Sequence, residues 1–348
     1  MKIAMIHADL PNESNGGVPF QAHYLANTLV DRGHDVTMFT FSPAYKECLY
    51  KVCQYPITLK TRKFQSFLLA FHLSRTKFTG FDIIHSHGDN YLMWGKHPQV
   101  RTFHGSAKDE AASAVNFKRR VLQSIFFYLE IAGTWVADIN IGVSEATRLR
   151  LPVISKIIPC GVDIERFKPG QKSENPTILF VGTLGGRKRG SLLAKVFCEQ
   201  VLTQFPKAEL WAVSDTPLIG EGIRNFGRVP LETLCDLFQK AWIFCLPSTY
   251  EGFGVPYIEA MASGTAVVAS PNLGAKEVLA EGKYGLIAED NQLGSSINQL
   301  IANPDLLNHY TEQGLVRSQD FSWDRIAEKY EKIYESLCES TAKVNEVI

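Results

Sequence analysis

The sequence predicts an α/β protein of two doubly wound lobes that face one another across a cleft. Short apolar runs alternate with helical patterns through both halves of the chain, as they do in successive βαβ units. The length of 348 residues exceeds one ordinary core and suits two domains of ~150 to 180 residues. We expect one domain over residues 1–165 and a second over residues 166–320.

Composition and charge narrow the class of protein. Hydrophobic residues make up 45% of the chain and the formal net charge is zero, so there is no overall basic surface for nucleic acid. The seven cysteines contain no Cys-x-x-Cys pair, which favours reduced thiols over a zinc site or a disulfide scaffold. The N-terminal apolar run is too short for a signal peptide, and no run approaches ~18 apolar residues. We expect a cytoplasmic protein without a membrane span.

The chain begins with a predicted βαβ unit. Residues 2–7 form an apolar strand, residues 19–32 have a helical pattern, and residues 34–40 form the next strand. Gly16 and Gly17 lie in the loop after the first strand, where open α/β sheets bind ligands. A glycine pair alone is a weak indication of such a site.

Further strands of the first domain are predicted over residues 82–87, 100–105 and 137–144. Two of them end in histidines, His87 and His104. A histidine at the end of a strand is as often a loop cap as a substrate contact. We interpret His87 as structural and leave both readings open for His104.

The second domain opens with a strand over residues 177–181, followed by the glycine-rich loop 182–190 and a helix. The loop contains the consecutive bases Arg187, Lys188 and Arg189. Glycines let the backbone approach a diphosphate, and Arg and Lys supply charge-assisted hydrogen bonds to it. The alternative is a basic turn that faces solvent.

The strongest functional indication lies in the stretch 246–269. An apolar strand over residues 242–246 leads into a loop with Gly252 and Gly254, and a helix is expected over residues 256–263. Backbone N–H groups that glycine leaves uncovered, beside the positive end of a helix, form an anion site.

Glu251 and Glu259 flank this loop, eight residues apart, and carboxylates bind vicinal hydroxyls well. The alternative is a tight turn whose second carboxylate only complements the helix dipole. The whole string is more specific, because it resembles the E-x7-E signature, E-G-F-G-x-P-x-x-E-A-M-A-x-G, of the retaining nucleotide-sugar glycosyltransferases of family 4. The matching residues are Glu251, Gly252, Phe253, Gly254, Pro256, Glu259, Ala260, Met261, Ala262 and Gly264.

The resemblance covers nearly the whole chain and implies the GT-B fold. This fold has two Rossmann-like lobes across a cleft, with the C-terminal helix, here 321–348, crossing back to the first lobe. The first domain would be the acceptor side and the second would bind the nucleotide-sugar donor. The sequence departs from the family at Cys160, where Asn is usual, and at Thr183, where many members have Arg.

The resemblance also implies roles for individual residues. Val229 would meet the base, Glu259 the ribose, Arg187 and Lys188 the diphosphate, and Glu251 the sugar. The implied catalytic residues are Glu251, His104, Arg187 and Lys188. The implied donor-binding residues are Gly16, Gly17, Arg187, Lys188, Val229, Glu251, Gly252, Phe253, Gly254, Val255 and Glu259.

The implied reaction is retaining transfer of a hexose from a nucleotide sugar, with UDP-glucose favoured, to a sugar, glycolipid or polysaccharide-precursor acceptor. We expect no cofactor, since the nucleotide sugar is a substrate. We also expect no metal, since the chain has no Asp-x-Asp and two bases with a helix N-terminus can stabilise the departing diphosphate. Two alternatives are an epimerase or phosphorylase of the same architecture and a non-catalytic sugar-nucleotide binder. The E-x7-E pattern disfavours the first, and the intact bases and carboxylates disfavour the second.

Two stretches of the first domain, 60–78 and 117–129, place basic residues beside aromatic-rich helical runs. This pattern suits helices that lie on an anionic membrane, and it would allow peripheral contact with the inner membrane face. The more common outcome for such helices is to cover the sheet and bury their aromatic residues in the core.

Overall fold

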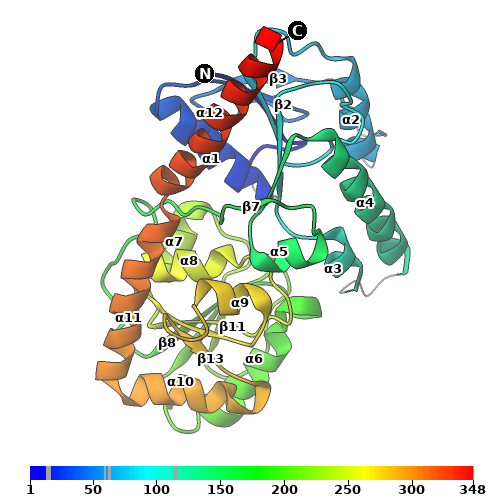
Figure 1. Cartoon of the computed structure of the whole chain (residues 1–348). Helices are drawn as coiled ribbons and strands as arrows, with labels where there is room; N and C mark the ends of the chain where they lie inside the picture. Colours follow the sequence, from blue (N-terminus) through cyan, green and yellow to red (C-terminus); the bar gives the residue numbers. More distant parts are fainter. Residues whose placement is uncertain (13–16, 59, 62–63, 113–116, 348) are drawn as a thin grey trace. The chain divides into compact units, whose positions relative to one another are not determined.

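A computed structural model describes residues 1–12, 17–58, 60–61, 64–112 and 117–347, which form two compact units (Figure 1). Unit 1 comprises Met1–Gly161 and Trp323–Ile348, and unit 2 comprises Val162–Ser322. Unit 2 is therefore an insertion into the sequence of unit 1. At the boundary, the Val162 N–H donates to the Phe321 carbonyl at 2.8 Å, so the two ends of unit 2 lie together.

Unit 1 contains a seven-stranded sheet in which every described pair is parallel. Its order is β3-β2-β1-β4-β5-β6-β7, so the direction of strand addition reverses between β1 and β4. The central strands are almost wholly buried, as expected for a sheet covered on both faces, and β4 and β5 bury polar side chains such as His85 and Arg101 beside apolar ones. The strands are β1 (Lys2–Ile6), β2 (Asp35–Thr40), β3 (Lys51–Gln54), β4 (Ile83–Ser86), β5 (Gln99–Phe103), β6 (Ile139–Gly142) and β7 (Lys156–Ile157).

The helices of unit 1 follow local sequence signals. α1 begins after Gly17, whose φ of 72° favours glycine, and has Pro19 in its first turn. Ser144 caps α5 by accepting the Thr147 N–H at 3.1 Å. The helices are α1 (Val18–Asp31), α2 (Gln65–Arg75), α3 (Ala107–Ala112), α4 (Phe117–Val136), α5 (Glu145–Arg150) and α12 (Trp323–Val347).

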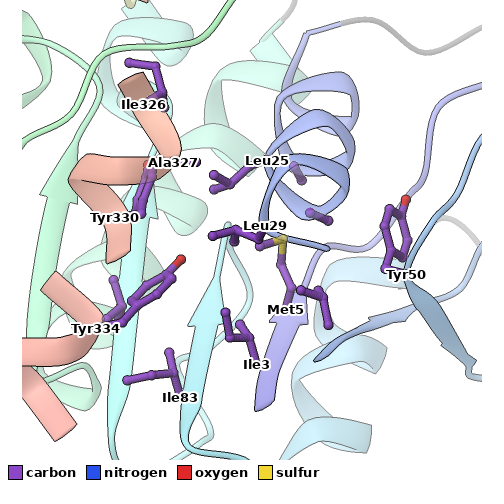
Figure 2. Packing of buried hydrophobic residues seen from close by; sticks show 14 of the residues in the cluster. Ile3, Met5, Leu25, Leu29, Tyr50, Ile83, Ile326, Ala327, Tyr330 and Tyr334 are labelled. Atoms are coloured by element: carbon purple, nitrogen blue, oxygen red, sulfur yellow. The ribbon is translucent and has the colours of Figure 1, made fainter. Parts of the chain in front are cut away.

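The C-terminal helix α12 completes the core of unit 1 (Figure 2). Tyr330 and Tyr334 are buried in the same cluster as Leu25 and Leu29 of α1 and the strand residue Ile3. A Cβ at Gly161 would lie 2.5 Å from the ring of Trp323, so the segment can pass the start of α12 only as glycine. The predicted return of the last helix to the first lobe is confirmed.

Unit 2 has a six-stranded parallel sheet in the order β10-β9-β8-β11-β12-β13. Its strands are β8 (Thr177–Val181), β9 (Glu209–Val213), β10 (Ile223–Asn225), β11 (Ile243–Leu246), β12 (Ala266–Ala269) and β13 (Leu286–Ile287). Its helices are α6 (Gly190–Val196), α7 (Leu231–Lys240), α8 (Val255–Ala262), α9 (Leu273–Val278), α10 (Leu293–Ala302) and α11 (Pro304–Ser318). α6 continues as a π-helical turn over Phe197–Val201, within the one helix that the sequence predicts there.

Each unit is thus a doubly wound α/β domain, and the predicted fold class is confirmed. Among the residues that the structure describes, no helix is both long enough and apolar enough to cross a membrane.

Candidate functional site

The loop after β8 in unit 2 brings the predicted bases against the loop that follows β11. Arg187 accepts the Thr249 N–H at 2.9 Å through its carbonyl, and its Nη1 donates to the Tyr250 carbonyl at 3.0 Å. A Cβ at Gly182 would lie 2.9 Å from the Phe180 ring, so glycine permits the tight start of the loop. The two loops meet at the carboxyl ends of neighbouring parallel strands, where open α/β sheets place ligands.

Both bases of this loop contact one carboxylate. Glu251 Oε1 lies 2.8 Å from Arg187 Nη1 and 2.7 Å from Lys188 Nζ. The Glu251 side chain is buried, and both contacts are ion pairs. Two cations and one anion therefore share a small, largely desolvated volume.

The cluster controls the charge of its members. Burial favours the neutral form of the Glu251 carboxyl, but Lys188 and Arg187 outweigh it and hold the pKa of Glu251 below its usual range. Burial also lowers the pKa of Lys188, and the attraction of Glu251 does not fully offset this. Glu251 is therefore an anion at neutral pH.

Glu259 lies on α8, and its carboxyl interacts electrostatically with Lys188. Burial raises the pKa of the Glu259 carboxyl to about 7, and Lys188 opposes that shift. The residue as a whole is half-buried. At neutral pH this carboxyl is divided between its charged and neutral forms.

The N-terminus of α8 is the second feature of the cluster. Gly254 precedes the helix with φ of 105°, and a Cβ there would clash with the ring of Tyr257. Pro256 occupies the first turn, and no side chain caps the helix. The positive end of the helix dipole can receive an anion. The helix begins one residue earlier than the sequence predicts.

Arg189, the third base of the loop, has a different role. It adopts a left-handed backbone with φ of 52°, and its guanidinium donates to Pro247 O at 2.6 Å and Ser270 Oγ at 3.0 Å. It also forms a two-point ion pair with Asp290 at 2.7 and 2.8 Å. Arg189 therefore connects the loop to the rest of unit 2, whereas Arg187 and Lys188 contact Glu251.

Asn272 at the start of α9 and Gly274 within it support the loop, and neither belongs to a motif that the sequence analysis identifies. Asn272 caps α9 through the Ala275 N–H at 2.9 Å and donates to the Ser248 carbonyl at 3.1 Å. A Cβ at Gly274 would lie 2.7 Å from the Glu251 carbonyl oxygen and 2.6 Å from that of Phe253. Both residues act through packing against a loop that is distant in the sequence, and no local motif predicts such a contact.

The remaining predicted residues divide between the two units. In unit 2, Val229 lies half-exposed in the loop between β10 and α7, while Phe253 is buried against Phe321 with ring centroids 5.6 Å apart. Gly252 and Val255 flank the Gly254 turn. In unit 1, Gly17 precedes α1. Gly16 lies outside the described residues.

His104 follows β5 in unit 1, and its Nε2 atom lies 2.9 Å from Nδ1 of His87, which follows β4. Burial lowers the pKa of His104 to about 3 and that of His87 well below the usual value. His7 follows β1 and lies at the same edge, with its ring centroid 6.5 Å from that of His87. A histidine directly after each of three buried strands is the sequence signal that would have linked them.

Two family comparisons span most of the chain. Residues 15–166 match the family described as Glycosyltransferase Family 4, and residues 161–317 match that described as Glycosyl transferases group 1. This chain belongs to the family 4-like glycosyltransferases.

Individual relatives agree with this assignment. The glycosyltransferase is 28% identical to a phosphatidyl-myo-inositol mannosyltransferase of Mycobacterium tuberculosis, over 76% of each chain. Its fold resembles the sucrose-phosphate synthase of Thermosynechococcus elongatus, with a TM-score of 0.79 at 22% identity, over 97% of this chain and 99% of that one. It also resembles Anabaena Alr3699/HepE in complex with UDP-glucose, with a TM-score of 0.74 at 16% identity, over 97% and 100% of the two chains.

In this glycosyltransferase, the described residues contain no group of three or more His, Cys, Asp or Glu side chains arranged to hold a metal ion. The charged groups that the structure brings together are Arg187, Lys188, Glu251 and Glu259.

Proposed function

We propose that this glycosyltransferase moves a hexose from a nucleotide sugar to a sugar or lipid-linked acceptor, with retention of anomeric configuration. The observation that carries the proposal is the cluster of Arg187 and Lys188 around Glu251, beside the uncapped N-terminus of α8. Two cations and a helix N-terminus match the charge of a diphosphate. A carboxylate already occupies the position where negative charge is stabilised.

The cluster suits the charge that develops during transfer. Cleavage of the bond between the anomeric carbon and the phosphate oxygen makes the sugar positive and the departing diphosphate negative. Arg187 and Lys188 would strengthen their contacts with the diphosphate as it leaves, which lowers the barrier without a metal ion. Glu251, held as an anion, would lie beside the positive sugar.

The other donor contacts follow along unit 2. Glu259 would bind the ribose hydroxyls, and the backbone at Val229 would meet the base. Gly252 and the backbone from Phe253 to Val255 would hold the sugar. The UDP-glucose complex of the Anabaena protein supports a nucleotide-sugar donor, and the mannosyltransferase relative supports transfer of a hexose. We favour UDP-glucose over GDP-mannose.

The acceptor would bind to unit 1 beside His104, Gly17 and Gly16. Retention would arise from attack on the same face from which the diphosphate departs, with a leaving phosphate oxygen taking the proton of the acceptor hydroxyl. A covalent intermediate on Glu251 is the less favoured route. Its carboxylate charge is already shared by Arg187 and Lys188, which weakens it as a nucleophile.

Helix α4 supports an acceptor that comes from a membrane. Phe117, Val121, Ile125, Tyr128 and Trp135 recur at helical spacing and are all exposed, at 78%, 45%, 45%, 71% and 69%. A helix of 20 residues is about 30 Å long. Phe127 and Ile131 of the same helix pack on the buried residues Phe103 and Leu151 of unit 1.

The surroundings of this stripe favour an anionic lipid surface over another partner. Phe67 and Phe71 of α2 are also exposed, and Phe67 stacks on Phe126 of α4 with ring centroids 5.7 Å apart. Exposed Lys118 and Arg120 lie at the start of α4. Apolar side chains with adjacent cations suit the interface of a negatively charged bilayer. We therefore propose peripheral attachment to the inner membrane face.

A donor screen followed by a transfer assay tests the reaction. Thermal shift with UDP-glucose, UDP-galactose and GDP-mannose should identify one donor that stabilises the protein, and that donor should then transfer its sugar to a lipid or oligosaccharide acceptor with the α configuration retained. An epimerase would convert the nucleotide sugar when incubated with it alone. Formation of an epimer, or an inverted product, would overturn the proposal.

A further inference from the structure

Three histidines stand at the carboxyl ends of three adjacent strands in unit 1. His7 follows β1, His87 follows β4 and His104 follows β5, and the strand order reverses between β1 and β4. Ligands of doubly wound sheets bind at such a reversal. The three imidazoles therefore line the edge where unit 1 is expected to receive its ligand.

His87 and His104 form a joined pair. Nδ1 of His87 lies 2.9 Å from Nε2 of His104, and the ring planes are 27° apart with centroids separated by 5.2 Å. This is the geometry of two rings that meet edge to edge through their nitrogens. The outer nitrogens, His87 Nε2 and His104 Nδ1, are buried and have no hydrogen-bond partner among the described residues.

Both rings are neutral near pH 7, because burial lowers the pKa of each. A neutral imidazole carries one N–H and one acceptor nitrogen. If His87 donates the shared hydrogen bond, His104 keeps its own proton on Nδ1. If His104 donates, its Nδ1 becomes an acceptor and the proton of His87 moves to Nε2. The two outer nitrogens therefore always have opposite roles.

His85 holds the His87 ring in place. Its two nitrogens lie 2.7 Å from the Tyr334 hydroxyl and 2.8 Å from the Thr102 hydroxyl, so the ring has no spare nitrogen. It packs on the His87 ring with centroids 4.4 Å apart. Tyr334 belongs to α12, so the C-terminal helix fixes the surface against which His87 rests.

We propose that His87 is a positioning residue that couples the tautomer of His104 to its own, so that the direction of their shared hydrogen bond determines whether His104 Nδ1 donates to or accepts from a hydroxyl of the acceptor. This inference rests on the proposed transferase function. His87 would act through His104 rather than on the substrate. Without it, the His104 ring would sample both tautomers, and only one would suit the bound hydroxyl.

Three substitutions of His87, which differ in whether and where they place a polar group, test this role. His87→Leu fills the space without a polar group. His87→Asn places an amide on Cγ, where Nδ1 was attached, whereas His87→Gln places it one bond further out. His23→Leu is the matched control, since His23 is also buried in unit 1 and its Nδ1 lies 2.8 Å from the hydroxyl of Tyr50 instead. Thermal unfolding of each variant reports whether the fold survives.

The first readout is the tautomer of His104, measured by nitrogen NMR of protein labelled at its nine histidines. We expect one dominant tautomer in the natural protein and in His23→Leu, and a mixture in His87→Leu. Turnover should fall ~10-fold to 100-fold in His87→Leu, with donor KM unchanged. Losses of this size are typical when the hydrogen-bond partner of a functional imidazole is removed. His87→Asn should recover most of the loss and His87→Gln little.

An unchanged His104 tautomer in His87→Leu would overturn the proposal, and so would equal turnover of the Asn and Gln variants. The NMR measurement requires no substrate. If the natural protein transferred no sugar, the transferase proposal would fail while a tautomer change would still establish that His87 positions His104.

Discussion

The ammonium of Lys188 lies 2.7 Å from the carboxylate of Glu251. Arg187 contacts the same oxygen at 2.8 Å. In the proposed function, a diphosphate that binds here would take both cations from this carboxylate, and the negative charge of Glu251 would compete with it.

Removing either base should therefore damage catalysis more than folding. Arg187→Ala and Lys188→Ala should each lower kcat by ~10² to 10³, because each removes a contact that strengthens as the diphosphate leaves. Arg189→Ala is the matched control, since Arg189 holds Pro247, Ser270 and Asp290. It should cost about 1 to 3 kcal/mol of stability and affect kcat less. Normal kcat and donor KM in Lys188→Ala would disprove the diphosphate assignment.

Substitutions of the two signature carboxylates, Glu251 and Glu259, should have different effects on nucleotide binding. Glu259→Ala should weaken UDP, because the ribose is common to every form of the donor. Glu251→Gln should preserve or tighten UDP binding, since it removes an anion that shares Arg187 and Lys188, while lowering turnover. Calorimetry with UDP on both variants measures the difference. Equal loss of UDP affinity in both would show that this division of roles is wrong.

Glu259 should make donor affinity depend on pH. Burial raises the pKa of its carboxyl to about 7, so it becomes charged as pH rises from 6 to 8. A carboxylate accepts ribose hydroxyls better than the neutral acid does, and affinity for UDP-glucose should rise severalfold over this range. Glu259→Gln should flatten the profile. A steep profile in that variant would assign the titration to another group.

The raised pKa of Glu259 should make the stability of the fold decrease with pH, whereas it makes the affinity for UDP-glucose increase. A carboxyl with a raised folded pKa contributes stability that is fully present below its unfolded pKa near 4.5 and lost as pH rises through about 7. Glu251 is the reverse case, because its pKa is lowered. Its contribution is present above the unfolded pKa and lost as pH falls through the lowered value. Urea unfolding of Glu259→Gln from pH 4 to 8 should lack the decline attributed to that residue.

Activity should survive chelation. Arg187, Lys188 and the N-terminus of α8 supply the charge that a metal ion would otherwise provide at the leaving diphosphate. Turnover should therefore be unaffected by excess EDTA. Loss of activity that Mg²⁺ or Mn²⁺ restores would refute the metal-free mechanism.

The protein should sediment with anionic liposomes and remain in solution with neutral ones. Lys118→Glu with Arg120→Glu should release it, because each basic residue near the surface contributes ~1 kcal/mol. Lys195→Glu with Lys207→Glu makes the same charge change on exposed residues of unit 2 and should have no effect. Absence of binding at low salt, or equal release by both pairs, would disprove attachment through α4. Lys63 and the side chain of Arg119, which belong to the same two basic stretches, lie outside the described residues.

The sequence predicts the fold well where neighbouring residues determine the secondary structure. Strands such as Thr177–Val181 are continuous apolar runs, and α8 has proline at its start. Lys51–Gln54 was not predicted, because a four-residue edge strand with exposed ends has too little periodicity. The helix Pro304–Ser318 is not predicted either, because its apolar side chains form no continuous stripe and the residues it buries fully are the small Gly314 and Ser318.

The site is predicted less completely, for a different reason. The motif indicates Glu251 and the basic loop indicates Lys188, but their 2.7 Å contact depends on how two strands lie side by side. The His87 and His104 pair likewise needs the register of β4 against β5. For α4 the pattern left two outcomes open. The structure leaves Tyr128 and Trp135 on the surface, although burial was the more common expectation.

The insertion of unit 2 into unit 1 sets an order of synthesis. Residues 323–348 leave the ribosome after the whole of unit 2, yet Tyr330 and Tyr334 belong to the core that holds Ile3 and Leu25. The whole of Val162–Ser322, whose two ends already lie together, is available to fold before that core can close. Until α12 is synthesised, His85 lacks its Tyr334 hydroxyl, and the histidine edge of unit 1 lacks its support. A nascent chain can therefore complete unit 2 while unit 1, which was begun first, still waits for its final helix.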